Sequence, residues 1–349
     1  MNSNTAILDH NKNLSVDNTA ELAASLQKAF SEVFPYIKEI ESIITSKLNS
    51  EAAILNEISL YLLNLGGKRV RPILALLSYK LLSKEHPTKE IFEAAAGIEL
   101  IHMATLLHDD IIDKSTKRRN KESAYVKYGY TPTLLAGDFL LVKAFGLCSH
   151  LGEFIIDSTE RACVFLTEGE VLEGTISEEY LPKLDSYYDI IYRKTASLFE
   201  LSTSVGAYCA HVDNSIIENM KLFGKHAGIC FQIIDDILDI VADENLLGKP
   251  SGTDLKQKTP SLINVLWLNS KDPEAINFFK KNEITKEEAD AASRHIKENT
   301  KIISDARIIA TEYAAKAKAA LNSISEAKIN TQIKEHLISI LEYTLHRCL

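Results

Sequence analysis

Apolar residues recur at intervals of three and four along most of the chain, which is the spacing of one face of an α-helix. No alternating pattern of the strand type competes with it. In residues 19–48 the apolar face comprises Leu22, Leu26, Phe30, Val33, Ile37, Ile40 and Ile44. Comparable runs lie at 51–65, 88–115, 133–150, 153–176, 184–210, 214–241, 273–281, 285–321 and 328–346, and a further helix opens at Pro72. The sequence therefore predicts an all-α fold, a single large bundle of antiparallel helices.

Polar segments interrupt this pattern at two places. The stretch ENLLGKPSGTDLKQKTPS (244–261) contains Gly, Pro and Ser and is expected to be a loop. Residues 1–18 are expected to be a disordered lead-in, because they lack the features of a signal or transit peptide. Residues 19–349 show no shift in composition and are expected to form a single domain.

Composition excludes several classes of protein. Of the 349 residues, 46% are hydrophobic and 25% are charged, which is enough for a sizeable core. The formal net charge of −9 argues against a general nucleic-acid binder, although a local basic cluster could still bind an anion. The 5 cysteines form no CxxC pair, which argues against a zinc site or a disulfide framework and for a reducing, cytoplasmic location. No apolar stretch approaches about 18 residues, so no membrane span is expected.

Two of the apolar helices are each expected to end in a cluster of aspartates. The clusters share the spacing DDxxD and comprise Asp109, Asp110 and Asp113 in the first, and Asp235, Asp236 and Asp239 in the second. Three carboxylates within one helical turn repel one another. Hard oxygen ligands with room for water suit Mg²⁺, whose coordination substrate phosphates often complete. One such cluster is usually a solvated helix face, but two in one chain indicate a magnesium site between packed helices.

Basic residues accompany both clusters. Arg118 and Arg119 follow the first cluster, and the turn GGKRVRP (66–72) adds three more cations. Further lysines lie near or after the second cluster, at Lys194, Lys249, Lys256 and Lys258, and for the last two a solvated surface is an open alternative. Arg and Lys beside such carboxylates imply a phosphorylated substrate. Because long apolar helices lie between the clusters, we expect the substrate to have a diphosphate head and a hydrocarbon tail.

These segments resemble those of the trans-isoprenyl diphosphate synthase (polyprenyl synthetase) family. The matching motifs are GGKRVRP (66–72), ELIHMATLLHDDIID (99–113) with the arginines at 118–119, GDFLL (137–141), TEGEV (167–171), KTASLFE (194–200), FQIIDDILD (231–239) and GKPSGTDL (248–255). The resemblance implies the isoprenoid synthase fold, in which helices surround a central apolar cavity. It also implies a Mg²⁺-dependent prenyltransferase that condenses isopentenyl diphosphate with an allylic diphosphate.

The resemblance further implies a role for individual residues. The main Mg²⁺ ligands would be Asp109, Asp113 and Asp235, holding three ions once the diphosphate is bound, with Asp110, Asp236 and Asp239 in support. The allylic diphosphate would contact Arg118, Lys194 and Lys249, and isopentenyl diphosphate would contact Lys68, Arg71, His102 and Arg119. Oxygens of Thr195 and Gln232 would face the cation that develops on the allylic substrate. Two alternatives stay open: His102 as a hydrogen-bonded core histidine, and Gln232 as a helix-to-helix hydrogen bond.

The sequence departs from the family pattern at three points. Asn120 stands where relatives usually have Gly after the paired arginines, and Asn tolerates the left-handed backbone that such a turn needs. The loop after Asp254 is one residue shorter than usual, which leaves the role of Lys258 open. The C-terminus offers His346 and Arg347 to close over the second substrate site.

Product length is expected to depend on the cavity wall below the first cluster. Ala104 and Thr105 lie about one turn before Asp109, at positions where bulky aromatics stop chain growth in this family. Because both are small, the floor would fall to Ile101, Ile98 or a partner subunit. The sequence therefore predicts a product of twenty carbons or longer, either geranylgeranyl or a longer chain, and predicts shorter products for Ala104→Phe.

Two other functions share these features. A regulatory subunit of a heteromeric prenyl synthase would usually lose aspartates, whereas both clusters here are complete. A class I terpene cyclase would keep one aspartate-rich motif and lack GGKRVRP. The resemblance also implies a homodimer, with the two diphosphates as partners, no nucleic acid, and at most a peripheral membrane contact for product release.

Overall fold

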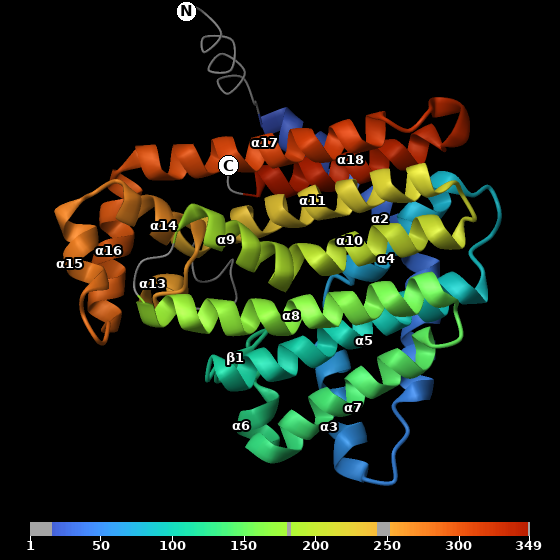
Figure 1. Ribbon diagram of the computed structural model, residues 1–349, viewed down its shortest axis with the longest axis horizontal. Coiled ribbons are helices and arrows are strands. Elements are labelled where there is room, and N and C mark those ends of the chain that lie inside the picture. Colours follow the sequence, from blue (N-terminus) through green and yellow to red (C-terminus); the bar gives the residue numbers. More distant parts are fainter. Residues whose placement is uncertain (1–15, 180–182, 243–251, 348–349) are drawn as a thin grey trace, which may run out of the picture.

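The computed structural model describes residues 16–179, 183–242 and 252–347, with side chains from residue 24 to residue 175 in the first of these ranges. Long helices dominate them, and the all-α prediction is confirmed (Figure 1). Two strands of two residues each, β1 (Lys117–Arg118) and β2 (Lys121–Glu122), form a small antiparallel hairpin.

The helices follow one another with short connections. The first part of the chain forms α2 (Val16–Lys47), α3 (Ala53–Asn64), α4 (Val70–Leu82), α5 (Lys89–Ile112), α6 (Ala124–Tyr128), α7 (Tyr130–Cys148) and α8 (Glu153–Glu179). The middle part forms α9 (Leu184–Ile191), the π-helical turn η2 (Tyr192–Ala196), α10 (Ser197–Cys209) and α11 (Asn214–Val241). The last part forms α13 (Thr253–Gln257), α14 (Leu262–Asn269), α15 (Pro273–Phe279), α16 (Lys286–Glu298), α17 (Thr300–Asn322), the 3₁₀ turn η3 (Glu326–Lys328) and α18 (Thr331–His346).

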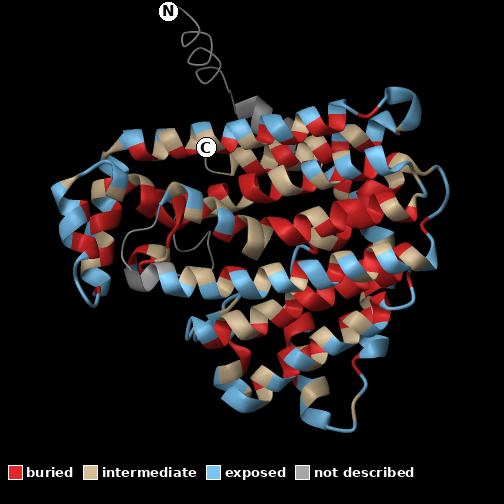
Figure 2. Ribbon diagram, viewed as in Figure 1, coloured by how far each residue is buried: buried red, intermediate tan, exposed pale blue. Residues whose placement is uncertain are grey.

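Helix α10 lies at the centre of the bundle. It packs against α4, α5, α8 and α11, and α11 packs in turn against α17. Figure 2 shows that α10 is buried along most of its length, whereas α8 and α17 alternate between buried and exposed residues, as amphipathic outer helices do. Buried apolar side chains from Val33 to Leu341 form one continuous core cluster.

Several boundaries differ from the sequence prediction. The run 285–321 is two helices, α16 and α17, because Asn299 has a non-helical backbone (φ −84°, ψ 76°), at a point that no Gly or Pro marks in the sequence. Part of the stretch expected to be a loop, 253–257, forms α13, and the unpredicted α14 follows it. Helix α2 begins at Val16, inside the segment expected to be disordered.

The hairpin was not predicted because its strands are too short to show alternation. Lys117 pairs with Glu122, and Arg118 pairs with Lys121. The two turn residues, Arg119 and Asn120, have positive φ angles of 52° and 63°. Asn is one of the few residues that adopts this conformation readily, so the turn forms without the usual glycine.

Two helices, α5 and α7, are long and apolar enough to cross a membrane by length and composition, although no span was expected from the sequence. In the apolar stretch of α5 that could span a membrane, 72% is buried inside the protein, as is usual for a core helix. In α7 only 39% is buried, so an apolar face of α7 remains exposed in the described chain.

A glycine permits the close packing of α10 on α4. A Cβ atom added to Gly206 would lie 2.3 Å from the carbonyl oxygen of Ala75 and 2.7 Å from Cβ of Ser78. We expect Gly206→Ala to lower the free energy of unfolding by roughly 1–3 kcal/mol, because the helices must move apart. Gly174→Ala is the matched control: nothing lies within 4 Å of its added Cβ. Chemical denaturation should show the control unchanged or more stable; equal losses for both would contradict this account of the packing.

An ion pair joins α16 to the start of α15 and gives a pH-dependent contribution to stability. His295 Nε2 lies 2.6 Å from Asp272 Oδ2, and His295 Nδ1 lies 3.1 Å from Glu274 Oε2. The hydrogen bond to Asp272 raises the pKa of His295. A group whose pKa is higher in the folded protein stabilises it fully below the unfolded pKa, about 6.5 for histidine, and this stabilisation is lost as pH rises through the folded value. Thermal melts should therefore show the Tm difference between the wild type and His295→Gln shrinking above neutral pH, and a constant difference would refute the role of charge.

Candidate active site

The first aspartate cluster lies at the C-terminal end of α5. Asp109 and Asp110 occupy the last turn, and Asp113 is the residue that caps the helix. Asp110 is buried, and its Oδ1 accepts two hydrogen bonds from the Arg118 guanidinium, one of them 3.0 Å from Nε. The hairpin β1–β2 thus returns the chain so that Arg118 neutralises one member of the cluster.

The second cluster lies near the C-terminal end of α11, and two of its members have protein partners. Asp236 accepts hydrogen bonds from Tyr187 Oη (2.8 Å), Gln232 Nε2 (2.9 Å) and the backbone N–H of Leu262 (2.8 Å). Asp239 Oδ2 accepts one from the backbone N–H of Asp254 (3.1 Å). These carboxylates connect α11 to α9, α13 and α14.

The other three aspartates are differently placed. Within the described ranges, the carboxylates of Asp109, Asp113 and Asp235 make no hydrogen bond or ion pair. Burial raises the pKa of Asp109 to about 7 and also raises the pKa of Asp113. No three His, Cys, Asp or Glu side chains of the described chain converge on a single metal-sized point. This donor set does not form a closed protein cage around a metal ion. It suits a hard cation that keeps several coordination positions open for water or for a bound ligand.

Several contacts place the two clusters at the same end of the bundle. Gln257 of α13, just after the segment that binds Asp239, donates from Nε2 to the carbonyl oxygen of Asp113 (3.5 Å). Burial lowers the pKa of Lys68, and the negative charge of Asp235 raises it. Asp109 has the same effect on Arg71, which lies three residues further along the chain. The acidic groups of α5 and α11 therefore face a common basic turn.

The π-helical turn η2 presents Lys194 and Thr195 to this region. A Cβ atom added to Gly169 of α8 would lie 2.8 Å from Cγ of Lys194, so this glycine lets α8 approach η2 closely. Lys194 Nζ contacts Glu170 (2.7 Å) and Glu173, both on α8. Burial lowers the pKa of Lys194, but the two glutamates outweigh burial and raise it. The ammonium group is therefore charged at neutral pH.

A chain of hydrogen bonds runs from η2 to α11. Thr195 Oγ1 donates to Gln232 Oε1 (2.7 Å), and Gln232 Nε2 donates to Asp236 Oδ1 (2.9 Å). The orientation of the Gln232 amide is fixed by these two contacts, with its oxygen toward Thr195. The alternative of a helix-to-helix hydrogen bond for Gln232 is thus present in the structure.

Cationic side chains outnumber anionic side chains around the basic turn that precedes α4. Arg69 is buried and structural: its guanidinium contacts Glu41 (2.9 Å) and Glu99 (3.1 Å). Burial lowers the pKa of Arg71 to about 10, and its Nε has no hydrogen-bond partner. Burial and the nearby arginines hold the pKa of His102 well below its usual range, so His102 is neutral. Arg119 packs on Gly67, where an added Cβ would lie 2.7 Å from its guanidinium. This arrangement can bind an anion.

An apolar cavity of about 310 Å³ opens beside the first cluster. Its charged lining residues, here called the mouth, are Asp109, Glu170 and Lys194. The lining comes from α5, α7, α8 and η2, and its apolar residues include Leu134, Leu141 and Leu166. Thr105 lines this cavity, whereas Ala104 and Ile101 are fully buried and do not line it. An aromatic residue at 104 would therefore require the surrounding core to move.

Comparisons with known proteins fit this geometry. A family profile described as Polyprenyl synthetase matches residues 52–300. The chain belongs to the polyprenyl synthetase family. It is 35% identical over 241 residues to the short chain isoprenyl diphosphate synthase of Methanocaldococcus jannaschii, covering 68% of this chain and 72% of that protein. It is 34% identical over 324 residues to the geranylgeranyl diphosphate synthase of Sulfolobus acidocaldarius, covering 89% and 96%.

A solved structure shows the same fold. The polyprenyl synthase of Caulobacter crescentus, complexed with calcium and isoprenyl diphosphate, superposes with a TM-score of 0.86 at 29% identity, covering 93% of this chain and 98% of that one. This polyprenyl synthetase is therefore a trans-isoprenyl diphosphate synthase, a transferase with the isoprenoid synthase fold. Members of the family are Mg²⁺-dependent enzymes that use isopentenyl and allylic diphosphates.

For some residues of this polyprenyl synthetase that the sequence singled out, the structure offers no support for a role in binding. Other residues with contacts near the two clusters were missed. Lys249 lies outside the described residues. Lys258 is buried, and its Nζ contacts the carbonyl oxygens of Phe279 (3.5 Å) and Lys281, so it closes the C-terminal end of α15. Glu170 and Glu173 were missed, although their spacing of three on a helix could have indicated a shared partner. Tyr187 was missed because its partner Asp236 is 49 residues away.

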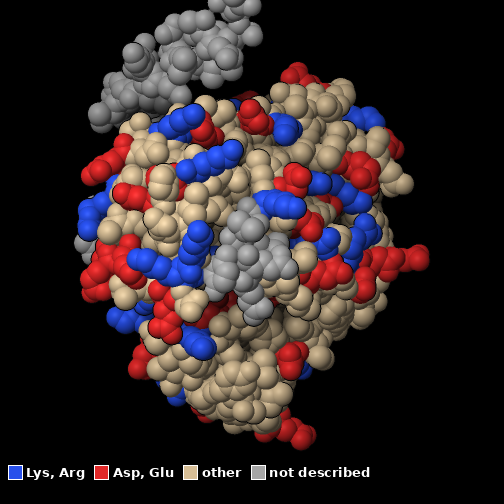
Figure 3. Space-filling model, turned by 60° about the vertical axis from the view of Figure 1, so that its left-hand side comes forward, with Lys and Arg blue, Asp and Glu red and all other residues tan. Residues whose placement is uncertain are grey.

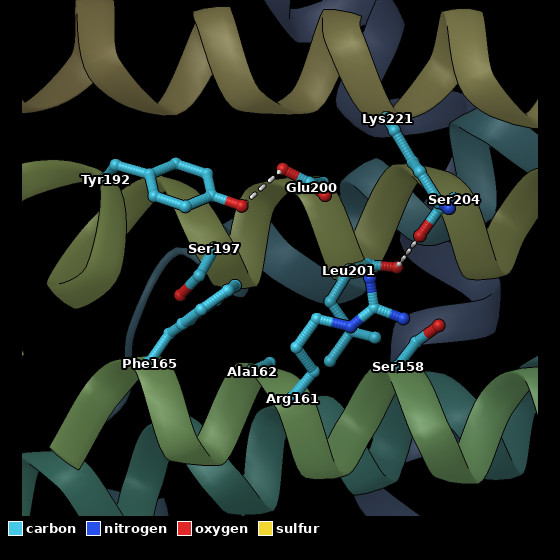
Figure 4. Close-up of a pocket in the computed structure, with 10 residues that line it drawn as sticks. All are labelled: Ser158, Arg161, Ala162, Phe165, Tyr192, Ser197, Glu200, Leu201, Ser204 and Lys221. Atoms are coloured by element: carbon cyan, nitrogen blue, oxygen red, sulfur yellow. Dashed lines mark hydrogen bonds between the residues drawn. The ribbon is translucent and has the colours of Figure 1, made fainter. Parts of the chain in front are cut away.

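A second, smaller pocket shares no lining residue with the cavity beside the first cluster. The pocket in Figure 4, between α8, η2, α10 and α11, has a volume of about 20 Å³, enough for about one water. There Tyr192 Oη donates to Glu200 Oε2 (3.1 Å), beside Arg161 and Lys221. On the face shown in Figure 3, Lys and Arg are interspersed with Asp and Glu, without the continuous basic surface of a nucleic-acid binder.

Proposed function

We propose that this enzyme condenses isopentenyl diphosphate with an allylic diphosphate to make a trans-polyprenyl diphosphate of twenty carbons or longer. One observation supports the proposal: Asp109, Lys194 and Glu170 line the same cavity as Leu134, Leu141 and Leu166. A charged mouth fits the diphosphate, and apolar walls fit the growing hydrocarbon chain.

The metal would be held by Asp109, Asp113 and Asp235, the three aspartates that lack protein partners in the described chain, with three ions present once the diphosphate is bound. When bound, Mg²⁺ neutralises the diphosphate and stabilises the charge that builds on it as leaving group. Asp110, Asp236 and Asp239 support the ligands by fixing Arg118, Gln232 and the chain around Asp254.

The allylic diphosphate would be bound by Arg118, Lys194 and Lys249. Arg118 and Lys194 both affect the pKa of Asp109, so they lie near the place where the diphosphate would bind. As the carbon–oxygen bond ionises, the hydroxyl oxygen of Thr195 and the amide oxygen of Gln232 present partial negative charge toward the allylic cation. The apolar walls exclude water, which would otherwise capture this cation as an alcohol.

Isopentenyl diphosphate would be bound by Lys68, Arg71, His102 and Arg119. The unpaired Nε of Arg71 offers a buried donor, and neutral His102 can donate a hydrogen bond without adding charge. The isopentenyl double bond attacks the cation, and a proton is then lost. Since the sequence indicates no dedicated general base at this position, the departing diphosphate would accept this proton.

We further propose a homodimer through α7 and α8. Val142 on α7 and Val171 on α8 are 68% and 65% exposed. Another exposed apolar residue lies seven positions earlier on the same face of each helix, Leu135 on α7 and Val164 on α8. Such a stripe fits a second copy of the chain, as dimers are common in the family. Val142→Asp should therefore shift the protein toward monomer in analytical ultracentrifugation, whereas Ser149→Asp, an exposed change at the end of α7, should not.

The remaining expectations are proposals on the same basis. Residues 19–349 would form one domain, since one core cluster includes α2 and α18. The protein would act in the cytoplasm, with at most a peripheral membrane contact for release of its product.

Incubation with labelled isopentenyl diphosphate and each allylic primer in turn, with products sized by chromatography, tests the function. We expect chains of twenty carbons or longer from the purified protein and Mg²⁺. Activity that appears only after a second protein is added would favour the regulatory-subunit alternative. Cyclic hydrocarbon without consumption of isopentenyl diphosphate would favour the terpene cyclase.

A further inference from the structure

Lys194 is surrounded by carboxylates from two helices. Glu170 and Glu173 of α8 contact its ammonium group directly. Asp109 and Asp113 lie one turn apart at the C-terminal end of α5, which forms another wall of the cavity that Lys194 lines. Asp109, Glu170 and Lys194 all line the mouth of the same cavity. One ammonium group therefore contacts two glutamates and lines the same cavity as Asp109.

The sequence around Glu170 positions this arrangement. Gly169 allows η2 to approach α8, because a side chain there would collide with Arg193 Cβ and Lys194 Cγ, each 2.8 Å from an added Cβ. Glu170 and Glu173 then fall on one helix face, toward Lys194. Glu168 lies on another face and pairs with Arg193, whose Nε also contacts Asp189 (2.9 Å). The two neighbouring cations of η2 thus have separate glutamate partners.

We propose that Glu170 and Glu173 are positioning residues that hold Lys194 as an internal counter-ion of the cavity mouth, and that Lys194 exchanges these glutamates for the diphosphate when substrate binds. The inference rests on the proposed function, because it concerns how the diphosphate and Mg²⁺ reach this mouth. Before substrate arrives, Lys194 offsets the repulsion among the four carboxylates. Once Mg²⁺ is bound, Lys194 is no longer required for that charge and can turn to the phosphate oxygens.

This exchange has consequences of definite sign. The glutamates and the diphosphate compete for one ammonium group, so removing a glutamate charge should strengthen binding of a diphosphate when Mg²⁺ is absent. Lys194 and Mg²⁺ compete for the same carboxylates, so removing the lysine charge should strengthen binding of Mg²⁺ when the diphosphate is absent. A residue that merely supports the fold would weaken both binding events when altered.

Two calorimetric titrations of the full chain without turnover test the proposal. The first adds inorganic pyrophosphate in the presence of EDTA; the second adds MgCl₂ alone. Wild type, Glu170→Gln, Glu173→Gln and Lys194→Gln are compared, with Glu168→Gln and Arg193→Gln as matched controls from the neighbouring pair. Glu173→Gln is repeated in the Lys194→Gln background, so that the effect through Lys194 is separated from any other.

We expect Glu170→Gln and Glu173→Gln each to bind pyrophosphate about two- to fivefold more tightly, the scale of one partly exposed ion pair. Lys194→Gln should bind Mg²⁺ more tightly by a similar factor. The controls should match the wild type, and the effect of Glu173→Gln should vanish in the Lys194→Gln background.

Unchanged or weaker pyrophosphate binding by both glutamate variants, in protein whose thermal melt matches the wild type, would overturn the proposal. So would an effect of Glu173→Gln that persists without Lys194. If one glutamate variant does not fold, the other decides the question. Failure of the proposed function would be recognised separately, because the wild type itself would then bind neither Mg²⁺ nor pyrophosphate.

Discussion

Asp109→Asn and Asp235→Asn are each expected to lower kcat by roughly 10²–10³-fold, the usual scale for losing one preorganised electrostatic group. Asp109 ends α5 and Asp235 lies in α11, and neither carboxylate has a hydrogen-bond or ion-pair partner among the described residues. An amide has the same shape but binds Mg²⁺ weakly, so charge on the leaving diphosphate would be poorly stabilised. Initial rates with labelled isopentenyl diphosphate at saturating Mg²⁺ measure the effect.

The fold should not suffer from these changes. Burial raises the pKa of Asp109 to about 7, which shows that its charged form is disfavoured in the folded protein without a metal. Asp109→Asn should therefore leave the metal-free Tm unchanged or higher. Asp157→Asn, at an exposed position on α8, is the control and should keep full activity. Wild-type turnover by either variant would refute the shared magnesium site.

Thr105→Phe is expected to shorten the dominant product by one or more five-carbon units. Thr105 lines the cavity one turn before Asp109, and its side chain faces walls built by Leu134, Leu141 and Leu166. A phenyl ring there would occupy volume that the growing chain needs. Because growth then stops for lack of space and not for lack of chemistry, the rate of the first condensation should stay within a few-fold of the wild type.

Thr105→Val is the matched control, since valine has nearly the same volume as threonine and should leave product length unchanged. Chromatographic sizing of the products from both variants decides the matter. Ala104→Phe, which the family resemblance suggests, is a less direct test, because Ala104 is fully buried outside the cavity lining and an aromatic there must first displace the core. Identical products from Thr105→Phe and the wild type would contradict this position of the growing chain.

The two aspartate clusters could be found from the sequence because their chemistry is local. Both are contained within a helical turn, and the spacing DDxxD is visible without knowledge of the fold. Their internal division was not visible from spacing. Asp110 and Asp236 have the same place in each motif, but one is neutralised by Arg118 and the other is bound by Tyr187 and Leu262. These partners come from segments whose approach depends on how helices pack.

The helical boundaries divide in the same way. Periodicity located the long helices because each must bury one face. It did not locate the break at Asn299, which no Gly or Pro marks, or the hairpin at 117–122, which is too short for a pattern. The π-helical turn at Tyr192–Ala196 was equally invisible, although it places Lys194 and Thr195.

The sequence by itself determined the fold class, the acidic and basic groups, and the family, because apolar spacing and short motifs are properties of neighbours along the chain. The tertiary structure alone decided which carboxylates lack a protein partner among the described residues, that Glu170 and Glu173 hold Lys194, and that Thr105 and not Ala104 lines the cavity. The physical reason is that pairing and cavity shape arise between segments tens of residues apart. Their approach is set by the packing of whole helices, which no local pattern encodes.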